Sequence, residues 1–188
     1  MTFRKAIPQD FPPILELQKR NLLQNLRPQD QQDGFLSIEY TFDQLDRLNR
    51  ELGIFVALED DHLAGFLMTQ QMDFAVQSPL ITTMVKRFPA VQYMGRPLSG
   101  FRTFIYGPVC IDKEQRGQGI LEGLYDVMLK TLRGQYDVGV AFVSDNNSRS
   151  FHAHRDKLGM RVVDVFWFNG QRYNILVFSV GASGTESK

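Results

Sequence analysis

Cysteine and excess charge are nearly absent from this sequence, and each absence excludes a class of protein. With a single cysteine, Cys110, the chain forms no internal disulfide, which excludes the cross-linked scaffolds of small secreted domains. The 21 Lys and Arg residues balance 21 Asp and Glu residues, whereas nucleic-acid-binding proteins usually carry a basic excess that neutralises phosphates. We therefore expect no nucleic-acid partner.

Long apolar runs are also missing. The longest ones have the length of a strand, far short of the roughly 20 residues that cross a bilayer. The N-terminal residues Met1 to Lys5 lack the apolar run of a signal peptide. We therefore expect a cytoplasmic protein without a membrane partner.

The sequence does contain enough apolar material for one core. Of its 188 residues 43% are hydrophobic, and 15 are phenylalanine, which is an ordinary globular composition. The length is typical of a single domain. We predict one domain over residues 1–180, with an apolar excursion at residues 73–100 inside it and a frayed tail at residues 181–188.

Hydrophobic periodicity predicts the order of the elements. Helical spacing of apolar residues follows three potential N-caps, Asp10, Thr41 and the triplet Asn146-Asn147-Ser148, and one glycine-rich turn. Strand patterns occur at residues 3–7, 54–58, 63–72, 102–111, 138–143 and 161–180, the last as a hairpin that turns at Asn169-Gly170. The order β-α-α-β-β, insert, β-α-β-α-β-β predicts a mixed sheet with helices on its faces, a single α/β or α+β domain.

A proline and a glycine-rich turn mark the middle of the chain. Pro108 lies inside the strand predicted at residues 102–111, and because proline donates no ladder hydrogen bond it predicts a bulge or an edge there. The turn Arg116-Gly117-Gln118-Gly119-Ile120 follows and starts a strongly amphipathic helix. Helix-terminal N–H groups, the helix dipole and flexible glycines together form an anion site suited to phosphate. A turn that merely starts the helix is the alternative.

Two common phosphate motifs do not fit this turn. A P-loop needs Lys-Ser/Thr after its last glycine, and here Gly119 is followed by Ile120-Leu121. A dinucleotide-binding turn needs a third glycine three places after Gly119, where Glu122 stands. A nucleotide-binding module is therefore the weaker hypothesis.

The segment from Tyr106 to Ile120 resembles the acyl-CoA signature of the GNAT N-acetyltransferases. The family pattern is Arg/Gln-x-x-Gly-x-Gly/Ala; residues 116–120 match it, and Leu121 stands where Gly or Ala is usual. Residues 147–160 resemble the family's next helix, which begins near an Asn and ends in Leu-Gly-Phe/Met. The element order also matches the family fold, so the resemblance covers nearly the whole chain.

The resemblance implies acetyl-CoA as cosubstrate and assigns residues to it. The strand before the turn would leave backbone groups free for the pantetheine arm at Val109, Cys110 and Ile111. Asn147 stands where the family often has an Asn that contacts the cofactor arm. Backbone N–H groups would hold the pyrophosphate from Arg116, Gly117, Gln118, Gly119, Ile120 and Leu121.

The reaction that the resemblance implies is direct attack of an amine on the thioester, catalysed by an N-acetyltransferase. The backbone N–H of Cys110 or Ile111 is the expected oxyanion donor. His154 is the expected acid for the CoA thiolate, with a satisfied interior histidine as the alternative. No general base is evident: the candidates by proximity are water and the acidic residues Glu39, Asp73 and Asp145.

The acceptor site is expected at Phe35, Tyr40 and Phe74, whose rings suit an acceptor with an apolar part. The acceptor is a small-molecule or protein amine, and the sequence does not name it. Because no group of His, Cys, Asp and Glu has metal-ligand spacing, we expect no metal. The alternative function is a non-catalytic sensor that binds acyl-CoA.

The C-terminal hairpin carries an aromatic triplet at residues 166–168. These side chains either pair with a second subunit in a homodimer or belong to the core.

Overall fold

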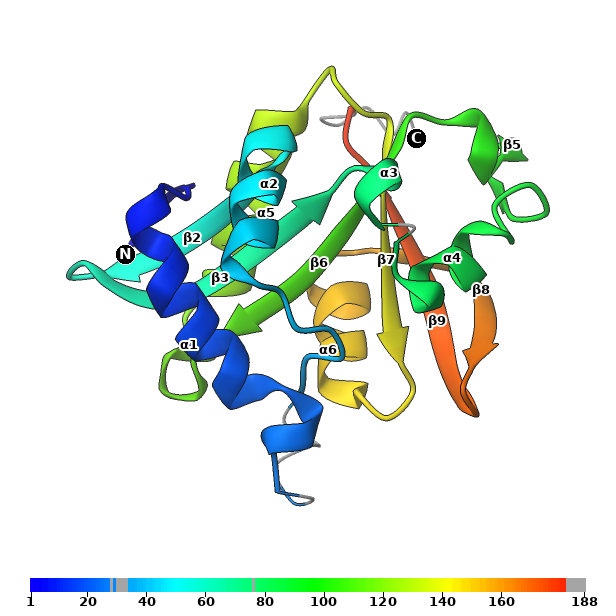
Figure 1. Cartoon of the computed structure of the whole chain (residues 1–188). Coiled ribbons are helices and arrows are strands. Elements are labelled where there is room, and N and C mark those ends of the chain that lie inside the picture. Colours follow the sequence, from blue (N-terminus) through cyan, green and yellow to red (C-terminus); the bar gives the residue numbers. More distant parts are fainter. Residues whose placement is uncertain (28, 30–33, 76, 182–188) are drawn as a thin grey trace.

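The fold is organised around a seven-stranded mixed sheet with helices on both faces (Figure 1). The structure is a computed structural model that describes residues 1–27, 29, 34–75 and 77–181. Its strands lie in the order β1-β2-β3-β6-β7-β9-β8, which confirms the predicted fold class and element order. Of the tail predicted to be frayed, residues 182–188 lie outside the described residues.

The elements agree closely with the predicted ranges. The strands are β1 (Thr2–Lys5), β2 (Gly53–Glu59), β3 (His62–Gln70), β6 (Thr103–Ile111), β7 (Val138–Ser144), β8 (Arg161–Phe168) and β9 (Gln171–Ser179), with β4 (Gln92–Tyr93) and β5 (Arg96–Pro97) in a separate small hairpin. The helices are α1 (Phe11–Asn21), α2 (Phe42–Glu51), α3 (Met72–Ala75), α4 (Pro79–Val85), α5 (Ile120–Leu132) and α6 (Ser148–His152). None of the helices among the described residues combines the length and the apolarity needed to span a bilayer.

The sheet opens between its two parallel strands. β6 and β7 pair only from Thr103 to Ile105 of β6. Beyond Ile105 the two strands diverge, and α6 lies between their ends (Figure 1). Pro108 lies in the divergent part, opposite a register shift in the pairing of β6 with β3. The register shift confirms the irregularity that Pro108 predicts. The divergence of β6 from β7 leaves a gap in the sheet.

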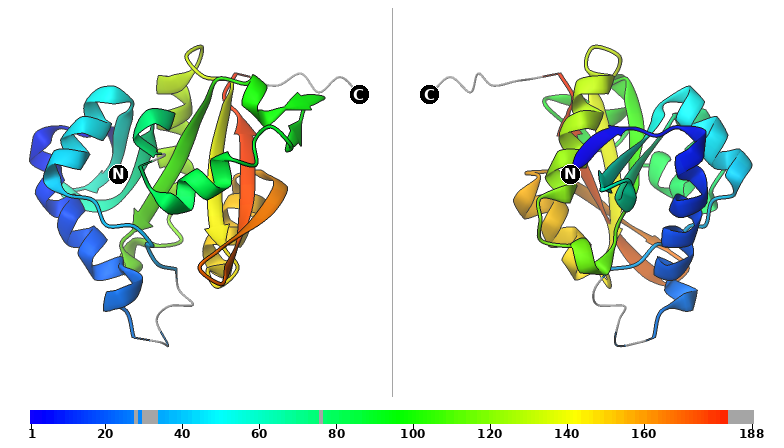
Figure 2. Two further views of the ribbon diagram at one scale, coloured as in Figure 1. Left: turned by 45° about the vertical axis from the view of Figure 1, so that its right-hand side comes forward. Right: turned by 90° about the vertical axis from the view of Figure 1, so that its left-hand side faces the viewer.

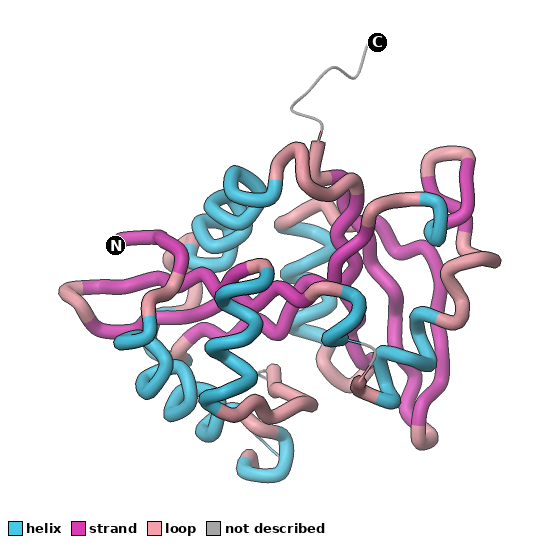
Figure 3. Tube along the Cα trace, turned by 45° about the horizontal axis from the view of Figure 1, so that its top comes forward, coloured by secondary structure: helices cyan, strands magenta, loops and turns pink. Residues whose placement is uncertain are grey.

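Both faces of the sheet are buried under helices (Figures 2 and 3). On one face, Leu124, Met128 and Leu132 of α5 form a core with Phe104 and Phe178 of the sheet, and α6 extends this layer. On the opposite face, α1 and α2 cover β2 and β3, and the excursion that carries α3 and α4 covers the other half of the sheet. The excursion is therefore part of the core.

Two of the predicted helix N-caps have different outcomes. Thr41 caps α2, because its Oγ1 accepts the Gln44 N–H at 3.4 Å and Gln44 Oε1 accepts the Thr41 N–H at 2.8 Å. Asp10 stands at the predicted N-cap position of α1, but its side chain makes no capping hydrogen bond to this helix. Its carboxylate accepts hydrogen bonds from both Arg4 Nη atoms, at 2.6 and 2.9 Å, and from the Ile7 N–H at 2.7 Å. The ion pair to β1 thus takes the place of a side-chain cap.

The aromatic triplet on β8 divides between core and surface. Phe166 is buried and belongs to the core, Phe168 is half-buried against it, and Trp167 is 64% exposed. β8 is an edge strand of the sheet. The homodimer stays a prediction, with Trp167 as the side chain of the triplet that is available for it.

Candidate functional site

A groove lies over the gap between β6 and β7. We call its outer part the cofactor groove: it is lined by Val109, Cys110 and Ile111 of β6, by the turn that precedes α5, and by α6 with the π-helical segment that follows it (Ala153–Lys157). We call its deeper part the inner pocket, which lies between loop residues 35–40, the parted strands and α6. The two parts are continuous, because both are lined by Phe35, Leu36, Val109, Asn147, Ser150 and His154.

The turn before α5 exposes the first N–H groups of the helix. Gly117 and Gly119 have φ angles of 86° and 77°, a region that glycine adopts without strain. A Cβ added at either position would meet no described atom within 4 Å, and both residues line the groove. Gly119 is the N-cap of α5 and no side chain caps it. The arrangement is an anion site at a helix N-terminus.

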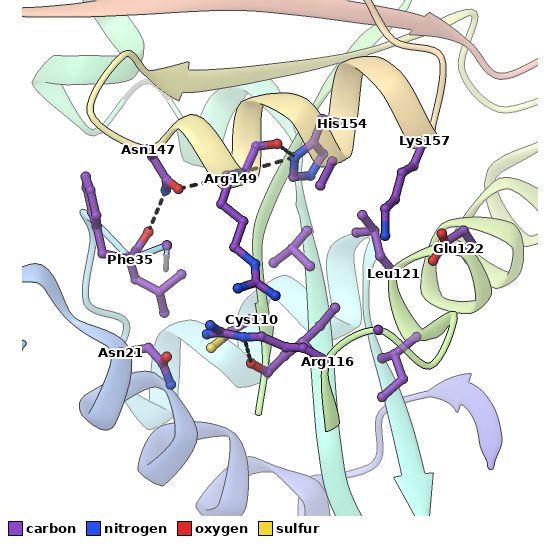
Figure 4. A pocket seen from close by; sticks show the side chains of 18 of the residues that line it. Asn21, Phe35, Cys110, Arg116, Leu121, Glu122, Asn147, Arg149, His154 and Lys157 are labelled. Carbon is purple, nitrogen blue, oxygen red and sulfur yellow. Dashed lines mark hydrogen bonds between the residues drawn. The ribbon is translucent and has the colours of Figure 1, made fainter. Parts of the chain in front are cut away.

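Three basic side chains surround this end of the groove (Figure 4). Arg116 extends from the turn and donates from Nε to the Ile111 carbonyl at 3.2 Å. Arg149 extends from α6 into the same space, and Lys157 reaches toward the start of α5, where Glu122 lies. Sequence analysis identified Arg116 but missed Arg149 and Lys157, because a basic residue on an exposed helix carries no local signal.

One predicted cofactor residue, Gln118, behaves differently from its neighbours. Ile120 and Leu121 line the groove as expected. Gln118 does not line it: its side chain is exposed and donates to Gln115 Oε1 at 3.0 Å. We therefore expect Gln118 to contact a ligand in the groove through its backbone and not through its side chain.

The free edge of β6 presents backbone groups to the groove. The Asp112 N–H donates to Ala64 of β3 at 2.9 Å, and N–H groups two residues apart on a strand point to the same side. The Cys110 N–H therefore points to β3, and the N–H groups of Val109 and Ile111 point to the edge from which β7 has parted. Cys110 as oxyanion donor is thus a wrong prediction. The Cys110 thiol is buried, and burial raises its pKa to about 12.

Asn147 joins the two walls of the groove. Its Oδ1 accepts the Ser150 N–H at 3.3 Å, which caps α6 as predicted, and its Nδ2 donates to the Phe35 carbonyl at 3.2 Å (Figure 4). The loop that carries Phe35 is fixed at its other end, where Gln18 hydrogen-bonds both backbone groups of Tyr40, at 2.8 and 2.9 Å. Asn147 thus borders the groove while its amide already has partners in the protein.

The predicted acceptor residues are only partly brought together. Phe35 and Tyr40 line the inner pocket. Gln70 fixes Tyr40 there, because its Nε2 donates to the Tyr40 hydroxyl and to the Gly107 carbonyl, each at 2.8 Å. Phe74 does not line the pocket; its ring stacks behind Tyr40 with 6.5 Å between centroids. The prediction for Phe74 is wrong because α3 turns it toward the core.

His154 is a buried histidine at the junction of the groove and the inner pocket. Its Nδ1 lies 2.7 Å from the Ser150 carbonyl oxygen. Because a carbonyl only accepts, Nδ1 carries the proton and Nε2 has a free lone pair. Burial lowers the pKa of His154, so the ring is neutral near pH 7. The expected thiolate acid is therefore a proton acceptor in its resting form.

Tyr106 is a residue that sequence analysis missed as a candidate. It is the first residue of β6 beyond the pairing with β7, it lines the inner pocket, and its ring meets that of His154 edge-on at 5.4 Å. Its hydroxyl is buried without a hydrogen-bond partner among the described residues. Such a group is costly unless a ligand or water satisfies it. The aromatic residue just before Gly107-Pro108 was the available signal.

The predicted base candidates are not in the inner pocket. Glu39 instead lines a wider cleft next to the inner pocket, which we call the outer cleft. Asp145 accepts from Arg172 at 2.7 Å and from Asn174 at 2.6 Å, and Asp73 lines none of these cavities. Within the described part of the chain, no three His, Cys, Asp or Glu side chains are grouped as a metal would require.

A family comparison identifies the class of protein that this groove belongs to. The sequence model of the acetyltransferase (GNAT) family matches residues 17–160. The chain is therefore a member of the GNAT acetyltransferase family, as its resemblance at residues 106–120 and 147–160 implied. No curated protein matches the sequence.

Solved structures agree with this fold at low sequence identity. The smu.2055 protein of Streptococcus mutans UA159 has a TM-score of 0.66 at 16% identity, over 96% of this chain and 99% of that one. An N-acetyltransferase of Staphylococcus aureus Mu50 has a TM-score of 0.63 at 15% identity, over 95% and 98%. The yncA protein of Salmonella typhimurium, solved with its cofactor acetyl-CoA, has a TM-score of 0.60 at 15% identity, over 100% and 98%.

Proposed function

We propose that this chain is an acyl-CoA-dependent N-acetyltransferase that moves an acetyl group from acetyl-CoA to an amine by direct attack. The observation that carries the proposal is the continuous groove from the Gly117–Gly119 turn to the gap between β6 and β7. It joins a phosphate-suited helix start to a buried pocket along the free edge of a strand. Membership of the GNAT family supports the same reading.

The cofactor would lie along this groove with its phosphates at the start of α5 and its thioester toward the inner pocket. The N–H groups at the start of α5, with Arg116, Arg149 and Lys157 around them, suit the phosphates of CoA. The N–H groups of Val109 and Ile111 on the free edge of β6 suit the pantetheine arm. The thioester would then reach the inner pocket, past Asn147. No metal is needed for any of these contacts.

The chemistry needs stabilisation of an oxyanion. When the amine nitrogen attacks the thioester carbonyl, a tetrahedral oxyanion forms, and collapse breaks the C–S bond and releases CoA thiolate. Among the N–H groups on the free edge of β6, that of Val109 borders both the groove and the inner pocket. Val109 replaces Cys110 as our proposed oxyanion donor.

His154 provides a route for the proton. Burial raises the pKa values of Tyr40, Tyr106 and Tyr173. Among the described residues that line the inner pocket, His154 is thus the group that exchanges a proton near neutral pH. Its Nε2 would take the proton from the ammonium of the tetrahedral intermediate and pass it to the departing thiolate. This combines a base step with the acid step expected from the sequence.

A sensor that binds acyl-CoA without turnover is the alternative function. One observation favours it: among the described residues, the lining of the inner pocket includes no Asp or Glu to act as general base. The proposal of catalysis therefore depends on His154. The amine acceptor, the cytoplasmic location, the homodimer and the absence of nucleic-acid and membrane partners remain expectations from sequence.

The test is release of CoA thiol from acetyl-CoA in the presence of a panel of amines, with the acetylated product identified by mass spectrometry. The His154→Gln variant is compared with His152→Gln, a change on the exposed face of α6. We expect kcat to fall in the first variant and to stay near wild type in the second. For the wild type, kcat/KM per unprotonated amine should stay level near neutrality and fall only below the ordinary histidine range of about 6.5, because burial lowers the pKa of His154 and protonation of its ring removes the acceptor. Cofactor binding without turnover of any amine would favour the sensor.

A further inference from the structure

The inner pocket is neutral and largely apolar. Among the described residues that line it there is no Asp, Glu, Lys or Arg, and His154, whose pKa burial lowers, is neutral near pH 7. The hydrogen-bonding side chains are hydroxyls, amides and this imidazole. The rest of the lining is apolar or aromatic, with Phe35, Ile38, Phe142 and Tyr173 among its members.

One wall of the inner pocket is built from packed aromatic rings. Phe142 of β7 meets Tyr173 of β9 edge-on at 6.1 Å between ring centroids. Tyr173 stacks on Phe166 of β8 at 5.2 Å. These rings belong to the core cluster on the face opposite to α5 and α6. The wall therefore lies on the acceptor side of the gap, away from the cofactor groove.

The outer cleft lies at the mouth of the inner pocket and has no basic side chain among its described lining residues. The two cavities share Phe35, Leu36, Ser37, Ser144 and Tyr173. Among the described residues that line the outer cleft, the exposed Glu39 carries the one charge. The basic side chains of Arg116, Arg149 and Lys157 line the cofactor groove, on the other side of Asn147.

From this distribution we infer that the acceptor is a primary amine on an apolar or aromatic body, with no carboxylate beside the amine. The inference rests on the proposed function. A carboxylate next to the amine would be desolvated in a pocket without a cation, which costs several kcal/mol unless it is paired, and Glu39 would repel it further. A polyamine would bring extra positive charge into a pocket without a carboxylate. Two sources share the favoured chemistry, small arylalkylamines and peptide N-termini with an apolar first residue.

Three matched acceptors test the inference: phenethylamine, phenylalanine amide and phenylalanine, with spermidine as the polyamine. Rates with saturating acetyl-CoA are compared as kcat/KM per unprotonated amine. We expect the first two to exceed phenylalanine and spermidine by at least about 100-fold. Preference for the amide indicates a peptide N-terminus, and preference for phenethylamine indicates a small amine. Equal or better rates with phenylalanine or spermidine would overturn the inference while leaving the proposed function intact.

A pair of variants tests the wall itself. Phe142→Ala removes a ring that lines the inner pocket, and Phe168→Ala removes a half-buried ring from the same core cluster that lines none of the cavities described here. We expect kcat/KM for phenethylamine to fall about tenfold in the first variant and less than twofold in the second. Melting temperatures show whether both variants fold. Equal losses in the two would overturn the assignment of the wall.

A binding readout keeps this test separate from that of catalysis. The shift in melting temperature that each amine adds in the presence of saturating CoA measures its binding without turnover. If no amine is acetylated, the proposed function fails, and the inference stands only if phenethylamine or the amide binds better than phenylalanine. If none of the four amines binds, the inference fails as well.

Discussion

A methyl group added at Gly119 separates the role of the turn in binding from its role in folding. Gly119 precedes α5 with a φ of 77°, and an added Cβ would enter the open cofactor groove. Gly134, just past the end of the same helix, has a φ of 80° and equal space around it, but it does not line the groove. Gly119→Ala and Gly134→Ala therefore impose the same backbone strain at opposite ends of α5.

The two variants should lose stability equally but differ in their affinity for acetyl-CoA. A left-handed conformation costs a residue with a Cβ about 1–2 kcal/mol, so each variant should lose a similar part of its free energy of unfolding. For a chain of this length that is a drop in melting temperature of roughly 2–8 °C. If the phosphates of CoA bind at this turn as proposed, the methyl group of Gly119→Ala would also displace a phosphate from the N–H groups. Loss of one charge-assisted hydrogen bond, about 1.5–3 kcal/mol, weakens binding roughly 10- to 150-fold.

Isothermal titration calorimetry with acetyl-CoA measures the dissociation constant of each variant, and thermal melts in the absence of ligand measure stability. Gly134→Ala should bind acetyl-CoA like the wild type. Wild-type affinity in Gly119→Ala, or an equal loss of affinity in Gly134→Ala, would refute the assignment of the turn to the phosphates.

Three further predictions concern the cap, the surface and the core. Asn147→Ala should lose about 1 kcal/mol of stability with its cap and weaken acetyl-CoA binding by calorimetry, whereas Asn146→Ala, which loses a hydrogen bond to Gln171, should leave binding unchanged. The hydrogen bonds from Arg102 lower the pKa of Asp137 from 3.8 to about 2, so this carboxylate stabilises the fold above about pH 4. The difference in melting temperature between wild type and Asp137→Asn should therefore vanish as the pH falls from about 4 to about 2. A difference that stays constant over this range would contradict the role of the Arg102–Asp137 pair. Gly139→Ala should destabilise the fold by about 1–3 kcal/mol in denaturant titrations, because its methyl group would overlap the Phe178 ring, and Phe178→Leu should restore part of the loss.

The order of helices and strands was predictable because each element carries its own periodic pattern of apolar residues. The apolar positions of α5 recur at helical spacing, and Thr41 and Asn147 are caps whose side chains bond within their own turn. The irregularity of β6 at Pro108 was also predictable, because proline donates no ladder hydrogen bond. The position of Asp10 before α1 was predictable, but its ion pair to Arg4, on another element, was not, and that pair takes the place of a side-chain cap.

The site was less predictable than the fold, because it depends on which neighbours each side chain meets. Phe74 and Tyr40 are both aromatic and close in the fold, yet only Tyr40 faces the inner pocket. The direction of the Cys110 N–H depends on its register with β3. The tautomer of His154 depends on the carbonyl of Ser150. None of these follows from residue type or spacing.

The most direct test of the central claim is a thermal-shift titration with acetyl-CoA, CoA, ATP and NAD in parallel. A ligand at about 100 times its dissociation constant stabilises the fold by roughly 2.7 kcal/mol, which is readily measured for a chain of this size. The account predicts stabilisation by acetyl-CoA and CoA, and no comparable shift with ATP or NAD. No response to either CoA compound would contradict the assignment of the groove, and a preference for ATP or NAD would favour a nucleotide-binding module instead.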